Sequence, residues 1–261
     1  MSGRDFYAEI YAADLDGQSK WLEYGAKEKA DSIELLTRHS GIRPTTLLEL
    51  GCGTGAVIKE RARRNLASRY VAVDYAQEAQ GRLRREAPAI ECMTADITDA
   101  GFHLQEPFDV VILSHVLEHL EDPAGFLRAI KSRLHFRCLI IEVPLEDLLL
   151  LRMKASIIGR NNPAGHVQFF TRKSFKLLLD EAGFAVGGER WFVPEMSVES
   201  IRFVCKKDGI GKIRTLYTLF TLRYLERILR PVWKRYWYSH LAVRCSLKSR
   251  MVTQPVPPAV F

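Results

Sequence analysis

The alternation of short apolar runs with segments of helical spacing constrains the fold of this chain more than any other feature. Nearly continuous apolar runs that are separated by helices are typical of a parallel sheet covered on both faces. The sequence therefore predicts an α/β fold with a doubly wound, Rossmann-like sheet. The expected strands are residues 46–50, 70–74, 90–93, 108–114 and 138–143, and the expected helices between them are residues 56–66, 77–86 and 123–134.

The flanking segments divide the chain into three parts. Residues 21–39 carry apolar and small side chains at helical spacing and end at Ser40-Gly41, so we expect residues 1–43 to form an N-terminal helical segment. After the last apolar run we expect an insertion, a helix capped by Thr171, and two short strands. These elements are residues 145–170, residues 171–183, a strand near Trp191 and a strand at 201–205, so the core would comprise 44–207 and a tail 208–261.

The first expected strand leads into a turn with three glycines, in the stretch LLELGCGTGAV of residues 47–57. Gly51, Gly53 and Ala56 satisfy the GxGxxG/A pattern with which dinucleotide-binding proteins hold a pyrophosphate, so an NAD-dependent oxidoreductase is one interpretation. Gly55 and Glu49 favour a different ligand. An acid just before the turn repels a pyrophosphate but suits a ligand with an ammonium group.

Three stretches make residues 47–184 resemble the class I S-adenosylmethionine-dependent methyltransferases: ELGCGTG (49–55), FDVVILSHVLEHLEDP (108–123) and GHVQFFTRKSFKLLLDEAGF (165–184). The match is close to the small-molecule branch that contains ubiquinone-type O-methyltransferases. This resemblance implies a seven-stranded sheet with an antiparallel last strand. It also implies S-adenosyl-L-methionine as cofactor and S-adenosyl-L-homocysteine as product, with residues 1–43 covering the cofactor and residues 145–170 on the substrate side.

The same resemblance assigns cofactor contacts to the ends of the first four strands. Asp74 would accept hydrogen bonds from both ribose hydroxyls, and the alternative is a cap on the helix at 77–86. Tyr75 would lie along the adenine. Asp96 and Ile97 would hold the adenine amino group, unless Asp96 is only a turn residue before Thr98. The complete set is Glu49, Gly51, Cys52, Gly53, Gly55, Asp74, Tyr75, Asp96, Ile97 and Ser114.

Histidines after the fourth strand are the candidates for catalysis. His115 and His119 are four residues apart and would share a helix face, and either imidazole could take a proton from a hydroxyl acceptor near neutral pH. Alternatively, Glu118 and His119 help to hold a divalent cation, as the ubiquinone-type relatives suggest, or brace the neighbouring loop. His115 stands where those relatives have a carboxylate, which weakens the case for magnesium. We therefore assign no metal.

His166 is a third catalytic candidate, because it lies in a loop that should overhang the pocket and loops often carry binding groups. A merely solvated side chain is the alternative interpretation. Arg160, Asn161 and Asn162 offer nearby polar contacts for a hydroxylated or anionic acceptor, but no residue identifies that acceptor.

The net charge of +7 belongs to the tail, because residues 209–261 contain ten Lys or Arg and a single acid, Glu226. On a helical wheel, residues 212–238 combine a narrow basic stripe with a wide apolar face, interrupted at Pro231. This basic amphipathic helical extension could pack on the catalytic domain or on a partner subunit, with its arginines in solvent. It could instead lie on an anionic membrane. Nucleic acid is disfavoured because the broad apolar face does not suit an electrostatic partner.

Composition and targeting features indicate a cytoplasmic protein. The five cysteines form no CxxC pair, the N-terminus lacks the features of a signal peptide, and no apolar run approaches the roughly 18 residues that span a bilayer. We therefore expect an enzyme that methylates a small or lipid-linked acceptor, most simply at oxygen, with peripheral membrane contact and homo-oligomers left open. The alternatives are the NAD-dependent oxidoreductase and a non-catalytic cofactor-binding module with a partner-binding tail.

Overall fold

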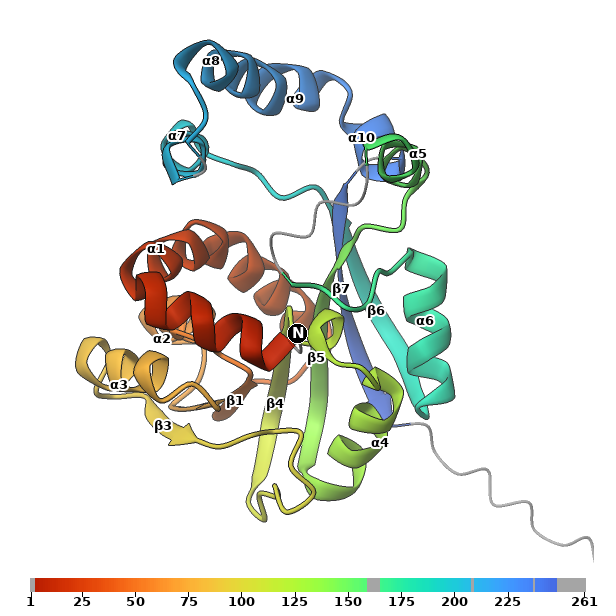
Figure 1. The fold of residues 1–261 in the computed structure, drawn as a ribbon. Coiled ribbons are helices and arrows are strands. Elements are labelled where there is room, and N and C mark those ends of the chain that lie inside the picture. Colours follow the sequence, from red (N-terminus) through yellow and green to blue (C-terminus); the bar gives the residue numbers. More distant parts are fainter. Residues whose placement is uncertain (1–2, 159–164, 208, 237, 248–261) are drawn as a thin grey trace, which may run out of the picture.

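A sheet of seven strands forms the centre of the protein (Figure 1). The computed structural model describes residues 3–158, 165–207, 209–236 and 238–247. The strands lie in the order β3-β2-β1-β4-β5-β7-β6, and β7 runs antiparallel to both of its neighbours. The predicted seven-stranded sheet with an antiparallel last strand is thus confirmed. The strands are β1 (Thr46–Leu50), β2 (Arg69–Asp74), β3 (Glu91–Thr94), β4 (Pro107–Ser114), β5 (His135–Leu145), β6 (Phe184–Phe192) and β7 (Ser239–Leu247).

Helices cover both faces of this sheet, as the nearly continuous apolar strands predict (Figure 1). On one face lie α1 (Gly3–Arg38), α2 (Ala56–Arg63) and α3 (Gln77–Glu86), and on the other lie α4 (Pro123–Arg133) and α6 (Arg172–Glu181). Successive residues of β1 point to opposite faces of the sheet. Leu47 therefore packs on the side of α1, α2 and α3, and Leu48 packs on the side of α4 and α6. Thr171 caps α6 as expected, because its side chain accepts a hydrogen bond from the Ser174 amide.

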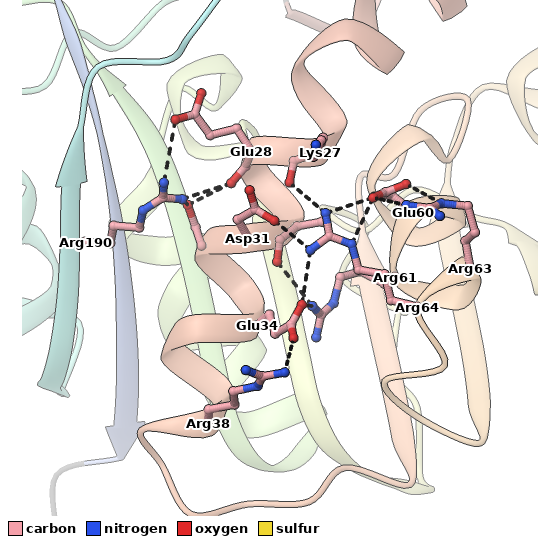
Figure 2. Close-up of polar contacts among 12 residues, drawn as sticks. Lys27, Glu28, Asp31, Glu34, Arg38, Glu60, Arg61, Arg63, Arg64 and Arg190 are labelled. Carbon is pink, nitrogen blue, oxygen red and sulfur yellow. Dashed lines mark hydrogen bonds and ion pairs between the residues drawn. The ribbon is translucent and has the colours of Figure 1, made fainter.

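The N-terminal helix α1 is longer than the sequence predicts and is fixed to α2 by arginines (Figure 2). It bends at Asp14, and it ends before the Ser40-Gly41 turn. The Arg64 guanidinium donates to Asp31 and Glu34 of α1, over 2.6 and 3.1 Å. Arg61, which is buried, donates to the Ala30 carbonyl over 3.1 Å. This anchoring holds the first helix across one edge of the pocket described below.

The strand predicted at residues 201–205 is wrong, because these residues belong to helix α7 (Val198–Lys207). Ile201 and Cys205 are both buried, and their separation of four residues fits a helix as well as a strand. The Ser197 hydroxyl accepts a hydrogen bond from the Ser200 amide at the start of this helix. The short apolar run at residues 201–205 was thus compatible with a strand or a helix, and the capping hydrogen bond favours the helix.

The division of the chain at residue 207 also needs correction, because the sheet takes its antiparallel strand β7 from the expected tail. Between α7 and β7 the chain forms α8 (Lys212–Phe220), a π-helical segment (Thr221–Leu225), α9 (Glu226–Ile228) and α10 (Arg230–Tyr236). We call residues 212–236 the helical arm. The arm breaks at Leu229, two residues before Pro231, close to the expected interruption. Figure 1 shows α8 and α9 apart from the sheet, whereas α10 lies near α5 (Leu149–Ile158), the helix of the expected insertion.

Candidate active site

The glycine turn after β1 forms one wall of a pocket at the carboxyl ends of the parallel strands. Gly51 and Gly53 line this pocket in left-handed conformations, with φ of 69° and 54°. A Cβ atom on Gly51 would lie 2.7 Å from a methyl of Val116, and one on Gly53 would lie 2.6 Å from the hydroxyl of Tyr11. Both positions therefore require glycine, and the bare backbone that results faces the pocket.

Gly55 has a different role from the other two glycines. It does not line the pocket, and it begins α2 with a φ of 74°. A Cβ atom here would lie 2.5 Å from the side chain of Leu83 in α3. Gly55 thus allows α2 and α3 to pack closely, and its predicted cofactor contact stays a prediction.

Asp74 lies at the end of β2 beside the glycine turn, where the sequence predicts a ribose contact. It is buried, and its carboxylate accepts hydrogen bonds from the amides of Gly53, over 2.7 Å, and Ala76, over 2.9 Å. The residue that precedes α3 is Ala76, and no side chain caps this helix. The alternative of Asp74 as a helix cap is therefore wrong, and its carboxylate is fixed at the pocket wall.

The other predicted cofactor residues also meet at this pocket. Tyr75, Asp96, Ile97, Cys52 and Ser114 all line it. Asp96 accepts from the amide and hydroxyl of Thr98, over 2.9 and 2.6 Å, so it forms the local turn that the sequence offered as an alternative and faces the pocket as well. The Ser114 hydroxyl has no hydrogen-bond partner among the described residues.

Glu49 and Lys29 bring titratable groups into the same pocket from β1 and α1. Burial raises the pKa of the Glu49 carboxyl to about 8, and burial lowers the pKa of the Lys29 ammonium. One oxygen of Glu49 has no hydrogen-bond partner among the described residues. A buried, incompletely paired carboxyl of this kind fits a ligand that carries an ammonium group, as the sequence predicts.

His119, in a 3-10 turn (Leu117–His119) after β4, also lines the pocket. Its Nδ1 atom is 3.4 Å from the Gly165 carbonyl, and its Nε2 atom is 3.3 Å from the hydroxyl of Tyr7 in α1. Burial lowers the pKa of this imidazole. His119 is therefore held neutral at the pocket wall.

His115 lies close to His119 in sequence but has different surroundings. It adopts a left-handed conformation, with a φ of 58°, which is uncommon outside glycine. Its Nδ1 atom is 3.1 Å from Glu118, and its Nε2 atom is 3.4 Å from Glu142. Burial and Lys29 act to lower the pKa of His115, but these two carboxylates outweigh them and the pKa is raised. The pKa shifts of His115 and His119 are thus opposite in direction.

The predicted loop residues have different outcomes. His166 is buried and does not line the pocket, because its Nδ1 atom lies 2.5 Å from a carboxylate oxygen of Glu146 and its ring packs edge-on against His119. Solvation of His166 is therefore not observed. The Glu118 carbonyl accepts from the amides of residues 167 and 168, over 2.8 and 2.9 Å, so Glu118 does brace this loop. Arg160, Asn161 and Asn162 lie outside the described residues.

The sequence analysis expected residues 1–43 to cover the cofactor but named none of the pocket residues of α1, and it missed β7. Tyr7, Tyr11 and Lys29 line the pocket from α1, and His240 of β7 contacts Glu142. Lys29 could have been found, because it interrupts the apolar face that carries Ala26 and Ile33. The tyrosines lie four residues apart before the predicted helix start, which is a weaker signal.

The glycine turn, the acid after β2 and the sheet order define a class I S-adenosylmethionine-dependent methyltransferase. Residues 15–187 match the family described as methyltransferase domain, which is more than half of the chain, and the protein belongs to this family. A ubiquinone biosynthesis O-methyltransferase of Aeromonas salmonicida (strain A449) is 31% identical over 123 residues, covering 46% of this chain and 50% of the relative. The chain spans about half the length of the curated relatives it matches.

Solved structures share the fold at low identity. The magnesium protoporphyrin IX methyltransferase of Synechocystis PCC 6803 with bound S-adenosylhomocysteine gives a TM-score of 0.56 at 16% identity, covering 88% of this chain and 86% of that one. The cyclase SpnF gives a TM-score of 0.65 at 12% identity, covering 95% and 97%. The family and fold give S-adenosylmethionine as cofactor in place of NAD. Because a cyclase also has this fold, the acceptor chemistry has to be argued from the site.

Proposed function

We propose that the protein methylates a hydroxyl oxygen of a small, amphiphilic or lipid-linked acceptor, with His119 as the general base. The orientation of the His119 ring carries this proposal. The carbonyl of Gly165 can only accept, so the Nδ1 atom that faces it over 3.4 Å carries the proton. The lone pair then belongs to Nε2, the ring atom that faces Tyr7 at the pocket wall.

The charge state of His119 supports the same role. An imidazole whose pKa is lowered by burial is neutral at pH 7 and can take a proton. The neighbouring Tyr7 has its pKa raised by burial, so its hydroxyl stays protonated and can donate to an acceptor oxygen. In His115 both ring nitrogens lie beside carboxylate oxygens, of Glu118 and Glu142, so neither is available to an acceptor hydroxyl.

The remaining pocket residues would bind the two substrates in line. S-adenosylmethionine supplies a methyl group activated by a positive sulfur. Asp74 would hold the ribose hydroxyls, Glu49 would attract the ammonium group, and Tyr75 with Ile97 would flank the adenine. Tyr7 and His119 would orient the acceptor hydroxyl and remove its proton as the oxygen attacks.

The helical arm supports an amphiphilic acceptor and a cytoplasmic protein that contacts a membrane peripherally. Its apolar side chains share one face and point into solvent, where Ile213 is 85% and Ile228 is 77% exposed. The remaining members of this exposed face are Leu216, Tyr217, Phe220 and Tyr224. Within the part of the chain that the structure describes, no helix is long and apolar enough to cross a bilayer.

Basic residues tether the arm, so its apolar face is the side left outward. Arg227 and Arg230 lie 3.6 and 2.9 Å from the carboxylate of Glu195, and the Lys234 ammonium lies 4.4 Å from the centre of the Trp191 ring. The arm thus contacts the rest of the protein through basic side chains, whereas a tail that packs on the catalytic domain would bury its apolar face there. The other bases of the arm complement an anionic lipid surface, which we propose as its occupant.

The reaction can be tested with S-adenosylmethionine and a set of phenolic acceptors, with and without a prenyl chain, in anionic vesicles. We expect S-adenosylhomocysteine and an O-methylated product, formed fastest from the prenylated acceptor. Transfer only to nitrogen or carbon acceptors would contradict the proposal. Cofactor binding without turnover of any acceptor would favour a non-catalytic cofactor-binding module.

A further inference from the structure

Three side chains from three neighbouring strands converge beside the pocket. His115 follows β4, Glu142 lies in β5 and His240 lies in β7, at the position paired with Pro144. The Nε2 atom of His115 is 3.4 Å from Glu142 Oε1 and 3.3 Å from His240 Nδ1, and this Nδ1 atom is 3.1 Å from the same carboxylate oxygen. Only His115 also lines the pocket.

The triangle formed by these three atoms has the dimensions of a metal coordination face. Bonds of 2.0–2.2 Å from zinc to imidazole nitrogen and carboxylate oxygen place tetrahedral ligand atoms about 3.3–3.5 Å apart. The three observed edges of 3.1, 3.3 and 3.4 Å come close to this. Hydrogen bonds account for only two of the three edges: if both imidazoles donate to Glu142 Oε1, no proton is left to join His115 Nε2 to His240 Nδ1, which lie 3.3 Å apart.

The outer contacts of the two imidazoles agree with a metal site. The other nitrogen of His115, Nδ1, lies 3.1 Å from a carboxylate oxygen of Glu118. The other nitrogen of His240, Nε2, lies 2.9 Å from the hydroxyl of Tyr238. Histidines that bind metals usually donate their second N–H to a carboxylate or another oxygen, which fixes the ring and the tautomer.

An unpaired buried oxygen is a further, independent observation. Glu142 is 2% exposed, and its Oε2 atom has no hydrogen-bond partner among the described residues. Such an atom is costly unless something coordinates it. A second coordination bond from this carboxylate to a bound cation would satisfy it.

We propose that His115, Glu142 and His240 bind one divalent transition-metal ion of the zinc type. Two imidazoles with one carboxylate suit zinc, cobalt, nickel or iron(II), whereas magnesium prefers oxygen ligands only. The ion would fix His115 at the pocket wall. This departs from the sequence expectation of no metal, and it does not depend on the acceptor chemistry proposed above.

A second group, of Glu118, His119 and His166, also brings its ligand atoms within 4.8 Å of one another. We favour the first group because its three ligand atoms lie within 3.4 Å of one another. In the second group, His119 faces the Gly165 carbonyl and Tyr7, and His166 contacts Glu146. The second group therefore provides a matched control.

The test is metal binding by the full-length protein after removal of metals with a chelator. We expect one equivalent of zinc, measured in competition with a chromophoric chelator, and a visible spectrum typical of four-coordinate cobalt(II) when cobalt is used. His240→Gln should abolish both signals. Tyr238→Phe, which removes only the outer partner, should weaken zinc binding about 10- to 100-fold.

His166→Gln is the control and should leave the zinc affinity unchanged. Loss of binding in His166→Gln with retention in His240→Gln would overturn the assignment in favour of the second group. No zinc binding by folded wild-type protein would overturn the site altogether. If His240→Gln does not fold, the zinc affinity of Tyr238→Phe and the cobalt spectrum of wild type test the proposed site instead. S-adenosylhomocysteine binding, measured separately, reports on the methyltransferase pocket.

Discussion

At the scale of single residues, the site depends on how burial and neighbours separate chemically similar groups. His115 and His119 are the same side chain four residues apart, yet two carboxylates raise the pKa of the first and burial lowers that of the second. A neutral, oriented His119 at the pocket wall is the base that O-methylation requires.

Replacement of His119 by glutamine should reduce kcat about 10²- to 10⁴-fold, the usual contribution of a general base. Binding of S-adenosylhomocysteine should persist. Because the pKa of His119 is lowered below its usual 6.5, wild-type activity should be full at neutral pH and fall only on acidification through that lowered pKa. The rate–pH profile of the residual activity in the variant should lack this step. An unchanged profile, or an unchanged kcat, would exclude His119 as the base.

Residue chemistry was predictable where it followed from a turn or a strand end. Nine of the ten predicted cofactor residues line the pocket, and Gly55 does not. Gly55 resembles the other two glycines in sequence, but it lacks a side chain because Leu83 of the neighbouring helix lies too close. Such a contact between two helices cannot be predicted from the spacing of the glycines.

At the scale of elements, the pocket depends on the docking of α1, because Tyr7, Tyr11 and Lys29 reach the site from this helix. Polar contacts to α1 come from Lys59 and Arg61 of α2 and from Arg64 directly after it. Arg64 donates to Asp31 and Glu34 of α1, whereas Arg63, among the described residues, pairs with Glu60 of its own helix.

Replacement of Arg64 by alanine should lower the free energy of unfolding by about 1.5–3 kcal/mol, the range for hydrogen bonds between charged groups. It should also weaken S-adenosylhomocysteine binding, because the loosened helix carries one wall of the pocket. Arg63→Ala is the matched control and should leave the free energy of unfolding nearly unchanged, because this side chain is exposed. Thermal unfolding and calorimetric titration of both variants provide the comparison. Equal effects of the two substitutions would show that the contacts to α1 are unimportant.

The elements themselves were largely predictable from β1 to β6. The errors occurred after α6, where residues 201–205 form helix and residues 239–247 form strand. The spacing of Ile201 and Cys205 fits both the period of a helix and the period of a strand. The strand β7 could not be predicted from its sequence, because basic residues surround it. Only its pairing with β5 and β6, which are far away in sequence, places it in the sheet.

At the scale of the whole molecule, an exposed apolar face on a basic arm requires an occupant. Ile213→Asp should reduce co-sedimentation with anionic vesicles at least about tenfold, because it places a charge on the face proposed to enter the lipid. Leu177→Asp changes an exposed leucine of α6, away from the arm, and should have no effect. Wild-type protein that never sediments would contradict the membrane proposal. A dimer that Ile213→Asp converts to monomer would identify a second copy as the occupant instead.

The central claim is that this pocket binds the cofactor through the acid at the end of β2. The most direct test is calorimetric titration of S-adenosylhomocysteine into wild type and Asp74→Asn, with thermal unfolding as the control for folding. We expect micromolar binding to wild type and, from the loss of charged hydrogen bonds to the ribose, a weakening of about 10- to 100-fold in the variant. No binding to folded wild type, or equal binding to both proteins, would contradict the account.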